Sequence, residues 1–263
     1  MKKLMFAIAI GVALMSCKSV KKTTNSNVKN YNPVVAHRGA WKEAKNPQNS
    51  IASLKEAIKI GCIGSEFDVH LTKDDSLVIC HDDEYQGLII EKSTYAELAA
   101  KKLPNGETIP TLQEYLAAGM DQTATKLVLE VKKSIISKER TIQLTERCVD
   151  LVHQLHAQKW ILYISFDYDA VKKIRSLDAK ANIEYLEGDI APAQLKADKI
   201  NGLDYHISVY QKHPEWIAES KKLGLDLNAW TVNEQKDLQY FIDHQFKYIT
   251  TNEPELLFQL LYK

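Results

Sequence analysis

The sequence lacks an excess of either charge. Lysine and arginine together number 34, as do aspartate and glutamate, so the formal net charge at pH 7 is zero. A chain with no overall positive field is not drawn to nucleic acid, and its folded part gains no attraction to a membrane surface from net charge. We therefore expect no nucleic acid partner, and the sequence gives no indication of an oligomeric state.

Cysteine is scarce, with four residues in the chain: Cys17, Cys62, Cys80 and Cys148. The last three are an odd number, and their spacing is not typical of a metal site. Export to an oxidising compartment would permit a disulfide. We nevertheless expect Cys62, Cys80 and Cys148 to be buried free thiols.

The apolar run near the N-terminus is shorter than a membrane-spanning helix needs. The apolar run from Leu4 to Met15 has about twelve residues, whereas a spanning helix needs roughly 20. It follows Lys2 and Lys3 and ends at Ser16 and Cys17, which is the layout of a signal peptide. The ending Leu14–Cys17 resembles a bacterial lipobox, which would make Cys17 the lipidated first residue of the mature protein. An ordinary signal peptide is the alternative.

We accordingly predict three regions. Residues 1–17 are a lipoprotein signal peptide with its lipobox. Residues 18–32 are rich in Lys, Asn, Ser and Thr and form a flexible tether. Residues 33–263 form the folded domain. The protein is then exported and held on the periplasmic or cell-surface side of a membrane by a lipid anchor at Cys17.

Strand-like and helix-like runs alternate through residues 33–263. Amphipathic helices are predicted at Ile51–Ile60, Glu139–Leu155, Asp169–Ser176, Pro214–Leu223 and Gln235–His244. Eight strands are predicted at Val34–His37, Ser65–Leu71, Lys126–Val131, Trp160–Ser165, Asn182–Leu186, Leu203–Ile207, Asp226–Trp230 and Lys247–Thr250. Eight parallel strands separated by helices indicate an α/β fold, the TIM (β/α)8 barrel. A short extra strand at Leu77–Cys80 is expected to form a hairpin with the second strand.

Acidic residues stand near the carboxyl ends of two predicted strands. Glu66 and Asp68 occupy alternate positions and point to the same face of the second strand, and Glu130 lies near the end of the third. Barrel enzymes carry their sites at this rim, and three converging carboxylates would repel one another without a cation. Because every ligand is oxygen, Ca²⁺ or Mg²⁺ is favoured over zinc. The alternative is that Glu130 merely pairs with Lys132.

Two histidines follow apolar strands beside these acids. His37 ends the first strand and His81 follows the extra strand. Such a pair can serve as acid and base in cleaving a phosphate ester, one taking a proton and the other giving one. The sequence leaves open which does which. His70 shares the face of Glu66 and Asp68, and we interpret it as a rim residue without a catalytic role.

Three further residues are candidates for binding substrate. Arg38 and Lys132 suit the oxygens of a phosphate, although each has a carboxylate nearby with which it could form a plain ion pair. Trp230 either lines the mouth of the site or packs in the core. Asp82 follows His81 and either orients that histidine or caps the loop.

Taken together, these motifs resemble the glycerophosphodiester phosphodiesterase family from about Val34 to the C-terminus. They are AHRGA, NPQNS, EFDVHLTKDD, VICHDD, IPTLQEYL, LVLEVK, ISF, WTVN and ITTNEP, in that order along the chain.

The resemblance implies a TIM barrel, a divalent cation, and hydrolysis of glycerophosphodiesters to sn-glycerol 3-phosphate and an alcohol. Residue by residue, it assigns metal binding to Glu66, Asp68 and Glu130. It likewise assigns catalysis to His37 and His81, and phosphate contact to Arg38 and Lys132.

The chain departs from the family pattern at Gln48, where the family usually has Glu. Only about 30 residues separate His81 from Ile109, too few for an added capping domain, so we expect an open site. Two alternative functions follow. One is a phospholipase D-like or lyase activity on lysophospholipids, and the other is an inactive lipoprotein that binds head groups.

Overall fold

The computed structural model describes residues 31–262, so the predicted signal peptide, the lipobox with Cys17 and most of the tether lie outside the described residues. Eight parallel strands form a closed ring, in which β1 pairs with both β11 and β2. These strands are β1 (Val34–Ala36), β2 (Gly64–Leu71), β6 (Lys126–Val131), β7 (Ile161–Ser165), β8 (Ile183–Tyr185), β9 (Gly202–His206), β10 (Asp226–Trp230) and β11 (Tyr248–Thr251). The predicted TIM (β/α)8 barrel is confirmed.

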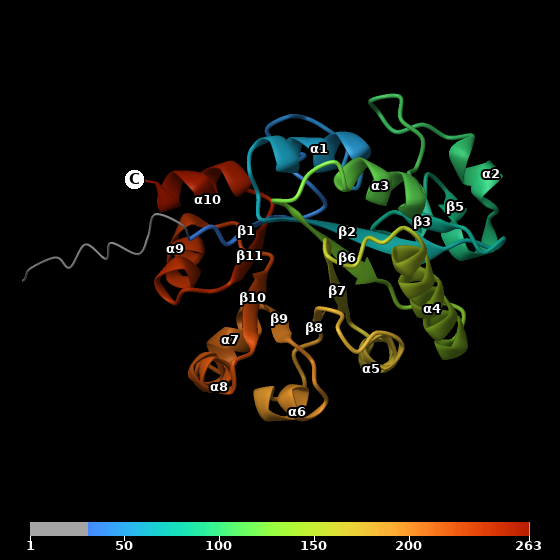
Figure 1. Cartoon of the computed structure of the whole chain (residues 1–263). Helices are drawn as coiled ribbons and strands as arrows, with labels where there is room; N and C mark the ends of the chain where they lie inside the picture. The colour runs from blue at the N-terminus through green and yellow to red at the C-terminus, as the bar shows by residue number, and fades with distance from the viewer. Residues whose placement is uncertain (1–30, 263) are drawn as a thin grey trace, which may run out of the picture. The chain divides into compact units, whose positions relative to one another are not determined.

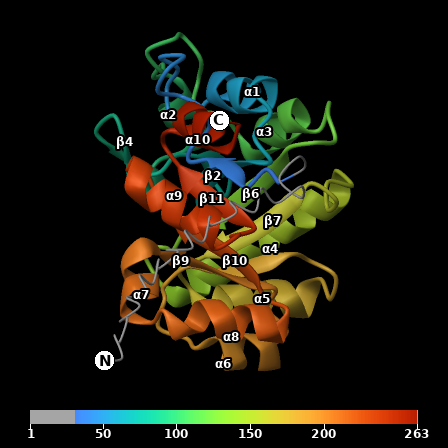
Figure 2. The same cartoon turned by 90° about the vertical axis from the view of Figure 1, so that its left-hand side faces the viewer.

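Helices lie outside the ring of strands (Figures 1 and 2). Those predicted are present as α1 (Ile51–Lys59), α4 (Lys138–Gln154), α5 (Tyr168–Leu177), α8 (Glu215–Leu223) and α9 (Gln235–Asp243). Five others were not predicted: α2 (Tyr95–Ala99), α3 (Leu112–Gly119), α6 (Pro192–Ala197), α7 (Ile207–Lys212) and α10 (Pro254–Leu261). All five have eight residues or fewer, too few to show a clear 3.6-residue period.

The extra strand is β3 (Leu77–Ile79), which pairs antiparallel with β2 outside the ring, with Val69 opposite Ile79. Its hairpin with the second strand is therefore confirmed. The chain then forms a second hairpin, β4 (Glu84–Tyr85) with β5 (Leu88–Ile89), and a short 3-10 helix, η2 (Ile90–Lys92). These small elements occupy the stretch before α2 without adding a capping domain.

The start of α1 links the fold to the site. Ser50 caps the helix, since its side chain accepts from the backbone N–H of Ser53, and Gly61 follows the helix at a φ of +85°. The preceding residue, Asn49, instead turns its side-chain amide to Asp68, donating to Oδ2 at 2.8 Å. The capping turn thereby positions a residue of the neighbouring strand.

The barrel interior contains both apolar and buried polar side chains. Six buried side chains form the apolar layer: Val35, Val128, Leu162, Ile164, Leu186 and Tyr248. Cys62, Cys80 and Cys148 are free thiols, and only Cys80 is not fully buried. Among the described residues, no helix has the length and apolar character needed to cross a membrane.

Candidate active site

Three carboxylates meet at the carboxyl ends of β2 and β6. Glu66, Asp68 and Glu130 each offer an oxygen, and these oxygens lie within 4.8 Å of one another. All three side chains are buried, with exposures of 3%, 1% and 7%. Asp68 and Glu130 are register partners across the two parallel strands, which explains their approach. The predicted convergence of these three residues is confirmed.

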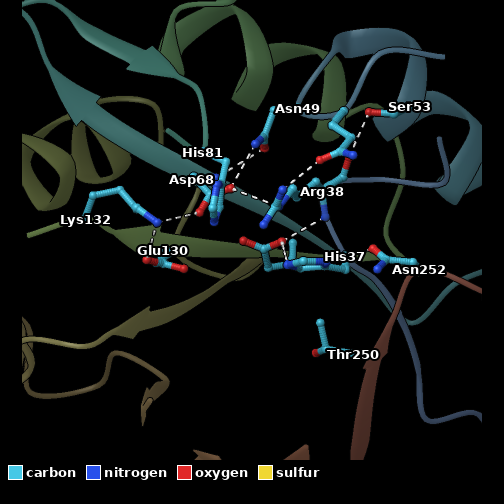
Figure 3. Close-up of polar contacts among 12 residues, drawn as sticks. His37, Arg38, Asn49, Ser53, Asp68, His81, Glu130, Lys132, Thr250 and Asn252 are labelled. Atoms are coloured by element: carbon cyan, nitrogen blue, oxygen red, sulfur yellow. Dashed lines mark hydrogen bonds and ion pairs between the residues drawn. The ribbon is translucent and has the colours of Figure 1, made fainter. Parts of the chain in front are cut away.

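Lys132 lies between two of the carboxylates (Figure 3), with Nζ 3.0 Å from Glu130 and 3.2 Å from Asp68. Although burial opposes it, Asp68 and Glu130 raise the pKa of the lysine above its usual range. Burial alone would raise the pKa of Asp68, but this pKa is lowered by Lys132, His81 and the amide of Asn49. The alternative pairing of Glu130 with Lys132 is thus present, and both residues still lie at the site.

Arg38 lies in a sharp turn after β1. Its φ is +58° and that of Gly39 is +81°. The backbone N–H of Arg38 donates to Glu66 Oε2 at 2.8 Å, and its guanidinium donates to Gln48 Oε1 at 2.8 Å. The Nε of Arg38 is buried, has no hydrogen-bond partner, and lies 4.0 Å from Asp68 Oδ2. This turn therefore presents an unsatisfied cationic donor beside the carboxylates.

His37 is oriented by Asn252 (Figure 3). The Nδ1–H of His37 donates to Asn252 Oδ1 at 2.8 Å, so the free Nε2 faces Glu66 at 3.9 Å. Burial and the Arg38 guanidinium lower the pKa of His37 to about 4. The imidazole is consequently neutral near pH 7, with a proton-accepting nitrogen toward the site.

His81 stands on the outer side of the site and is paired with a carboxylate. Its Nδ1–H donates to Asp82 Oδ1 at 2.7 Å, so Asp82 orients this histidine. His70, which the sequence led us to interpret as a rim residue without a catalytic role, is buried. It is 2% exposed, and its Nε2 donates to the His81 carbonyl at 3.4 Å, because the loop after β3 folds over the end of β2. His70 supports the backbone that carries His81.

A cavity of about 180 Å³ opens between these groups. It is lined on the polar side by His37, Arg38, Glu66, His81 and Glu130, and on the other by apolar side chains that include Phe166 and Trp230. The rings of Phe166 and Trp230 meet edge to face at 5.3 Å. Trp230 thus lines the site, and it also packs against the apolar layer. A wider groove of about 550 Å³ continues outward along His81, Lys132 and Ile135.

The residues present fit a divalent cation. Burial, with the carboxylates of Asp68 and Glu130, raises the pKa of Glu66 well above its usual range. Burial and Asp68 raise the pKa of Glu130 to about 7. Ionising all three acids is unfavourable in the protein alone, and a hard cation with oxygen ligands would remove this repulsion.

Several contributors were missed by reasoning from the sequence. Asn49 and Asn252 hold Asp68 and His37, Phe166 forms a wall, and Asp204 and Thr250 line the cavity. Asn49 and Asn252 each stand in a recognised motif, although their partners lie 19 and 215 positions away. Asp204 carried a usable signal, because it is an isolated acid among apolar residues of a predicted strand.

Comparison with known proteins agrees with this geometry. The model of the "Glycerophosphoryl diester phosphodiesterase family" matches residues 37–256. A glycerophosphodiester phosphodiesterase of Caldanaerobacter subterraneus is 28% identical over 247 residues, which are 88% of this chain and 98% of that protein.

Solved structures agree as well. A glycerophosphodiester phosphodiesterase of Parabacteroides distasonis is 41% identical, has a TM-score of 0.85, and matches over 88% of this chain and 97% of its own. An Oleispira antarctica phosphodiesterase, solved in complex with the product sn-glycerol-3-phosphate, shares the fold at 23% identity and a TM-score of 0.74, over 89% of this chain and 98% of its own. With its match extending over residues 37–256, the chain belongs to the glycerophosphoryl diester phosphodiesterase family.

Proposed function

We propose that this protein hydrolyses glycerophosphodiesters to sn-glycerol 3-phosphate and an alcohol, with the help of a divalent cation. The observation that carries the proposal is the meeting of three carboxylates, two histidines and a buried unpartnered Arg38 Nε around one cavity. Family membership and the relatives named glycerophosphodiester phosphodiesterase support it.

Glu66, Asp68 and Glu130 would hold the cation. Their oxygens favour Ca²⁺ or Mg²⁺. When bound, the cation supplies Lewis-acid polarisation of the phosphoryl group and neutralises negative charge that develops there. Arg38, through its buried Nε, and Lys132, through its ammonium, bind the phosphoryl oxygens and stabilise the same charge.

The hydrogen bonds of the two histidines assign them different roles. His37 keeps its proton on Nδ1 toward Asn252, so Nε2 takes the proton of the attacking hydroxyl, whether that hydroxyl belongs to the glycerol or to water. The Nδ1–H of His81 donates to Asp82, which orients the ring, and we assign to His81 the transfer of a proton to the oxygen of the leaving alcohol. Trp230 forms one wall for the bound substrate.

The test is release of glycerol 3-phosphate from glycerophosphocholine. We expect His37→Ala, His81→Ala and Glu66→Ala each to reduce kcat by at least a hundredfold, since general acid–base catalysis contributes roughly 10²–10⁴-fold. The exposed His156, outside the site, gives the control variant His156→Ala. Full activity in His81→Ala would refute its role, and an inactive wild-type protein would favour the head-group-binding alternative.

A second candidate is cleavage of lysophospholipids, in a phospholipase D-like or lyase reaction. It is favoured by two isoleucines near the mouth, Ile135 and Ile136, which are 49% and 54% exposed. Ile135 lines the outer groove and would contact an acyl chain. Faster release of choline from lysophosphatidylcholine than from glycerophosphocholine, reduced by Ile135→Ser, would favour this candidate over the first.

We also propose that Cys17 carries a lipid anchor on an exported protein, which the lipobox-like ending Leu14–Cys17 supports. Cys17→Ser should lose both the incorporation of labelled fatty acid and recovery with the membrane fraction. Cys80→Ser is the matched control, since Cys80 lies within the barrel domain. Unchanged membrane recovery of Cys17→Ser would contradict the anchor.

A further inference from the structure

The barrel interior contains two acidic residues that the proposed reaction does not use. Glu184 on β8 and Asp204 on β9 are 0% and 1% exposed. One carboxyl oxygen of each, Glu184 Oε1 and Asp204 Oδ1, is buried without a hydrogen-bond partner. A buried acceptor left without a donor is unfavourable. Only Asp204 of this pair lines the cavity, so a molecule bound there is available to satisfy it.

The residues beside Asp204 determine which kind of group would bind. The Thr250 hydroxyl donates to Asn228 Oδ1 at 3.2 Å, and the Asn228 amide donates to Glu184 Oε2 at 3.1 Å. The single hydrogen of Thr250 is therefore used inside the barrel, and its oxygen can only accept from a ligand. The Trp230 indole N–H is also used, because it donates to the Asp204 carbonyl at 3.0 Å.

At this end of the cavity, Thr250 and Trp230 have no free donor, and Asp204 Oδ1 has no hydrogen-bond partner. Its remaining surface includes the apolar side chains of Ile164 and Leu186. A ligand that fits must bring hydrogen-bond donors on a compact, largely neutral group. Hydroxyl groups of a polyol meet this requirement, whereas a quaternary ammonium has no N–H to donate.

The position of His81 indicates whether the glycerol or the leaving alcohol of the substrate faces Asp204. His81 lines both the cavity and the outer groove, whereas Asp204 lines the cavity alone. If His81 protonates the leaving alcohol, that alcohol lies toward the groove and the glycerol lies toward Asp204. We propose that Asp204 and Thr250 form a subsite that binds the glycerol hydroxyls, a role that rests on the proposed function above.

The experiment compares two diesters in wild-type protein and in Asp204→Ala. Glycerophosphocholine carries the glycerol hydroxyls, and bis(4-nitrophenyl) phosphate carries none. Asp204→Ala should reduce kcat/KM for glycerophosphocholine at least tenfold more than kcat/KM for the nitrophenyl diester, mainly through KM. Asp204→Asn retains an acceptor oxygen and should recover part of this difference. Equal reductions for both diesters would overturn the subsite.

Product analogues give a second readout that needs only folded protein. Asp204→Asn and Asp204→Ala should weaken inhibition by glycerol 3-phosphate more than inhibition by n-propyl phosphate, which lacks both hydroxyls. His156→Ala, a change of an exposed residue outside the site, should affect both inhibitors by the same factor. Equal weakening of both inhibitors in the Asp204 variants would overturn the subsite.

Two other outcomes have distinct meanings. If the wild-type protein releases no glycerol 3-phosphate from any glycerophosphodiester, the proposed function fails, and this inference fails with it. If the wild-type protein is active but Asp204 variants discriminate between choline and ethanolamine head groups instead, the proposed function stands and the glycerol subsite is wrong.

Discussion

At the scale of single residues, the chemistry depends on neutral partners that orient charged or titrating groups. Asn252 orients His37, Asn49 binds Asp68, and Gln48 binds the guanidinium of Arg38. Glutamine holds Arg38 by a hydrogen bond without neutralising it, so more of the positive charge remains for a phosphate.

Replacing Gln48 by Ala should therefore weaken catalysis moderately. One hydrogen bond contributes about 0.5–1.5 kcal/mol, which corresponds to roughly a two- to tenfold lower kcat/KM. Steady-state kinetics with glycerophosphocholine measures the effect, and Gln113→Ala on the exposed surface of α3 is the control. An unchanged kcat/KM would show that Gln48 does not contribute to catalysis.

We predict that a bound cation raises the free energy of unfolding by an amount that depends on pH, because the carboxylates that would hold the cation titrate. Without a cation, burial and Asp68 hold the pKa of Glu130 at about 7, above its ordinary value of 4.5. The native state then binds a proton more tightly than the unfolded chain does. The stabilisation from this group is complete below pH 4.5 and is lost as pH rises through 7. A cation favours the ionised acids and should restore stability at the higher pH.

Thermal unfolding in chelator and in excess Ca²⁺ or Mg²⁺, from pH 5 to 8, measures this effect. At a metal concentration of about 100 Kd the expected gain is about 2.7 kcal/mol, or roughly 5–10 °C in Tm, near neutral pH. The gain should shrink toward pH 5 and be smaller in Glu130→Gln. A gain that is the same at every pH would contradict the account.

At the scale of elements, the turn after β1 carries both His37 and Arg38. A Cβ at Gly39 would overlap the side chain and backbone of Ser53 on α1, and the φ of Gly39 is +81°. Gly61 has a similar φ of +85° with open space around it. Both glycines therefore have a left-handed backbone conformation, but only Gly39 would place a Cβ against neighbouring atoms.

This pair makes a matched comparison. Gly61→Ala should lower the free energy of unfolding by about 1–2 kcal/mol, because a residue with a Cβ is strained in the left-handed conformation. It should have little effect on kcat. Gly39→Ala should lower Tm further and reduce kcat more than tenfold, since Arg38 and His37 must shift. Thermal unfolding and kinetics on both variants measure this. Equal effects of the two changes would show that crowding at Gly39 is unimportant.

The sequence predicted the long elements well because each carries its own periodic pattern. All eight barrel strands and five helices lie within a few residues of their predicted positions. The short helices α2, α6 and α7 were not predicted, since five or six residues seldom define a period. The hairpin of β4 and β5 likewise depends on packing against β3 and η2 rather than on its own sequence.

At the scale of the whole molecule, closing the barrel brings distant residues to one rim. The predicted candidates Glu66, Asp68, Glu130, His37 and His81 do meet, because the strands that carry or precede them, β1, β3 and β6, all pair with β2. The burial of His70 and the acceptor-lined end of the cavity at Asp204 were not predicted. The burial of His70 follows from how the loop after β3 packs, which no local pattern in the chain records. The position of Asp204 in its strand could be predicted, but not which groups lie opposite it across the barrel.

The central claim is that Glu66, Asp68 and Glu130 hold one divalent cation that the hydrolysis requires. Its most direct test is to strip the protein with chelator and titrate Ca²⁺ or Mg²⁺ back, measuring bound metal and glycerol 3-phosphate release in the same samples. We predict no release from the stripped protein, activity that rises in proportion to one bound ion per chain, and loss of both in Glu130→Gln. Sustained release of glycerol 3-phosphate by the stripped protein would contradict the claim.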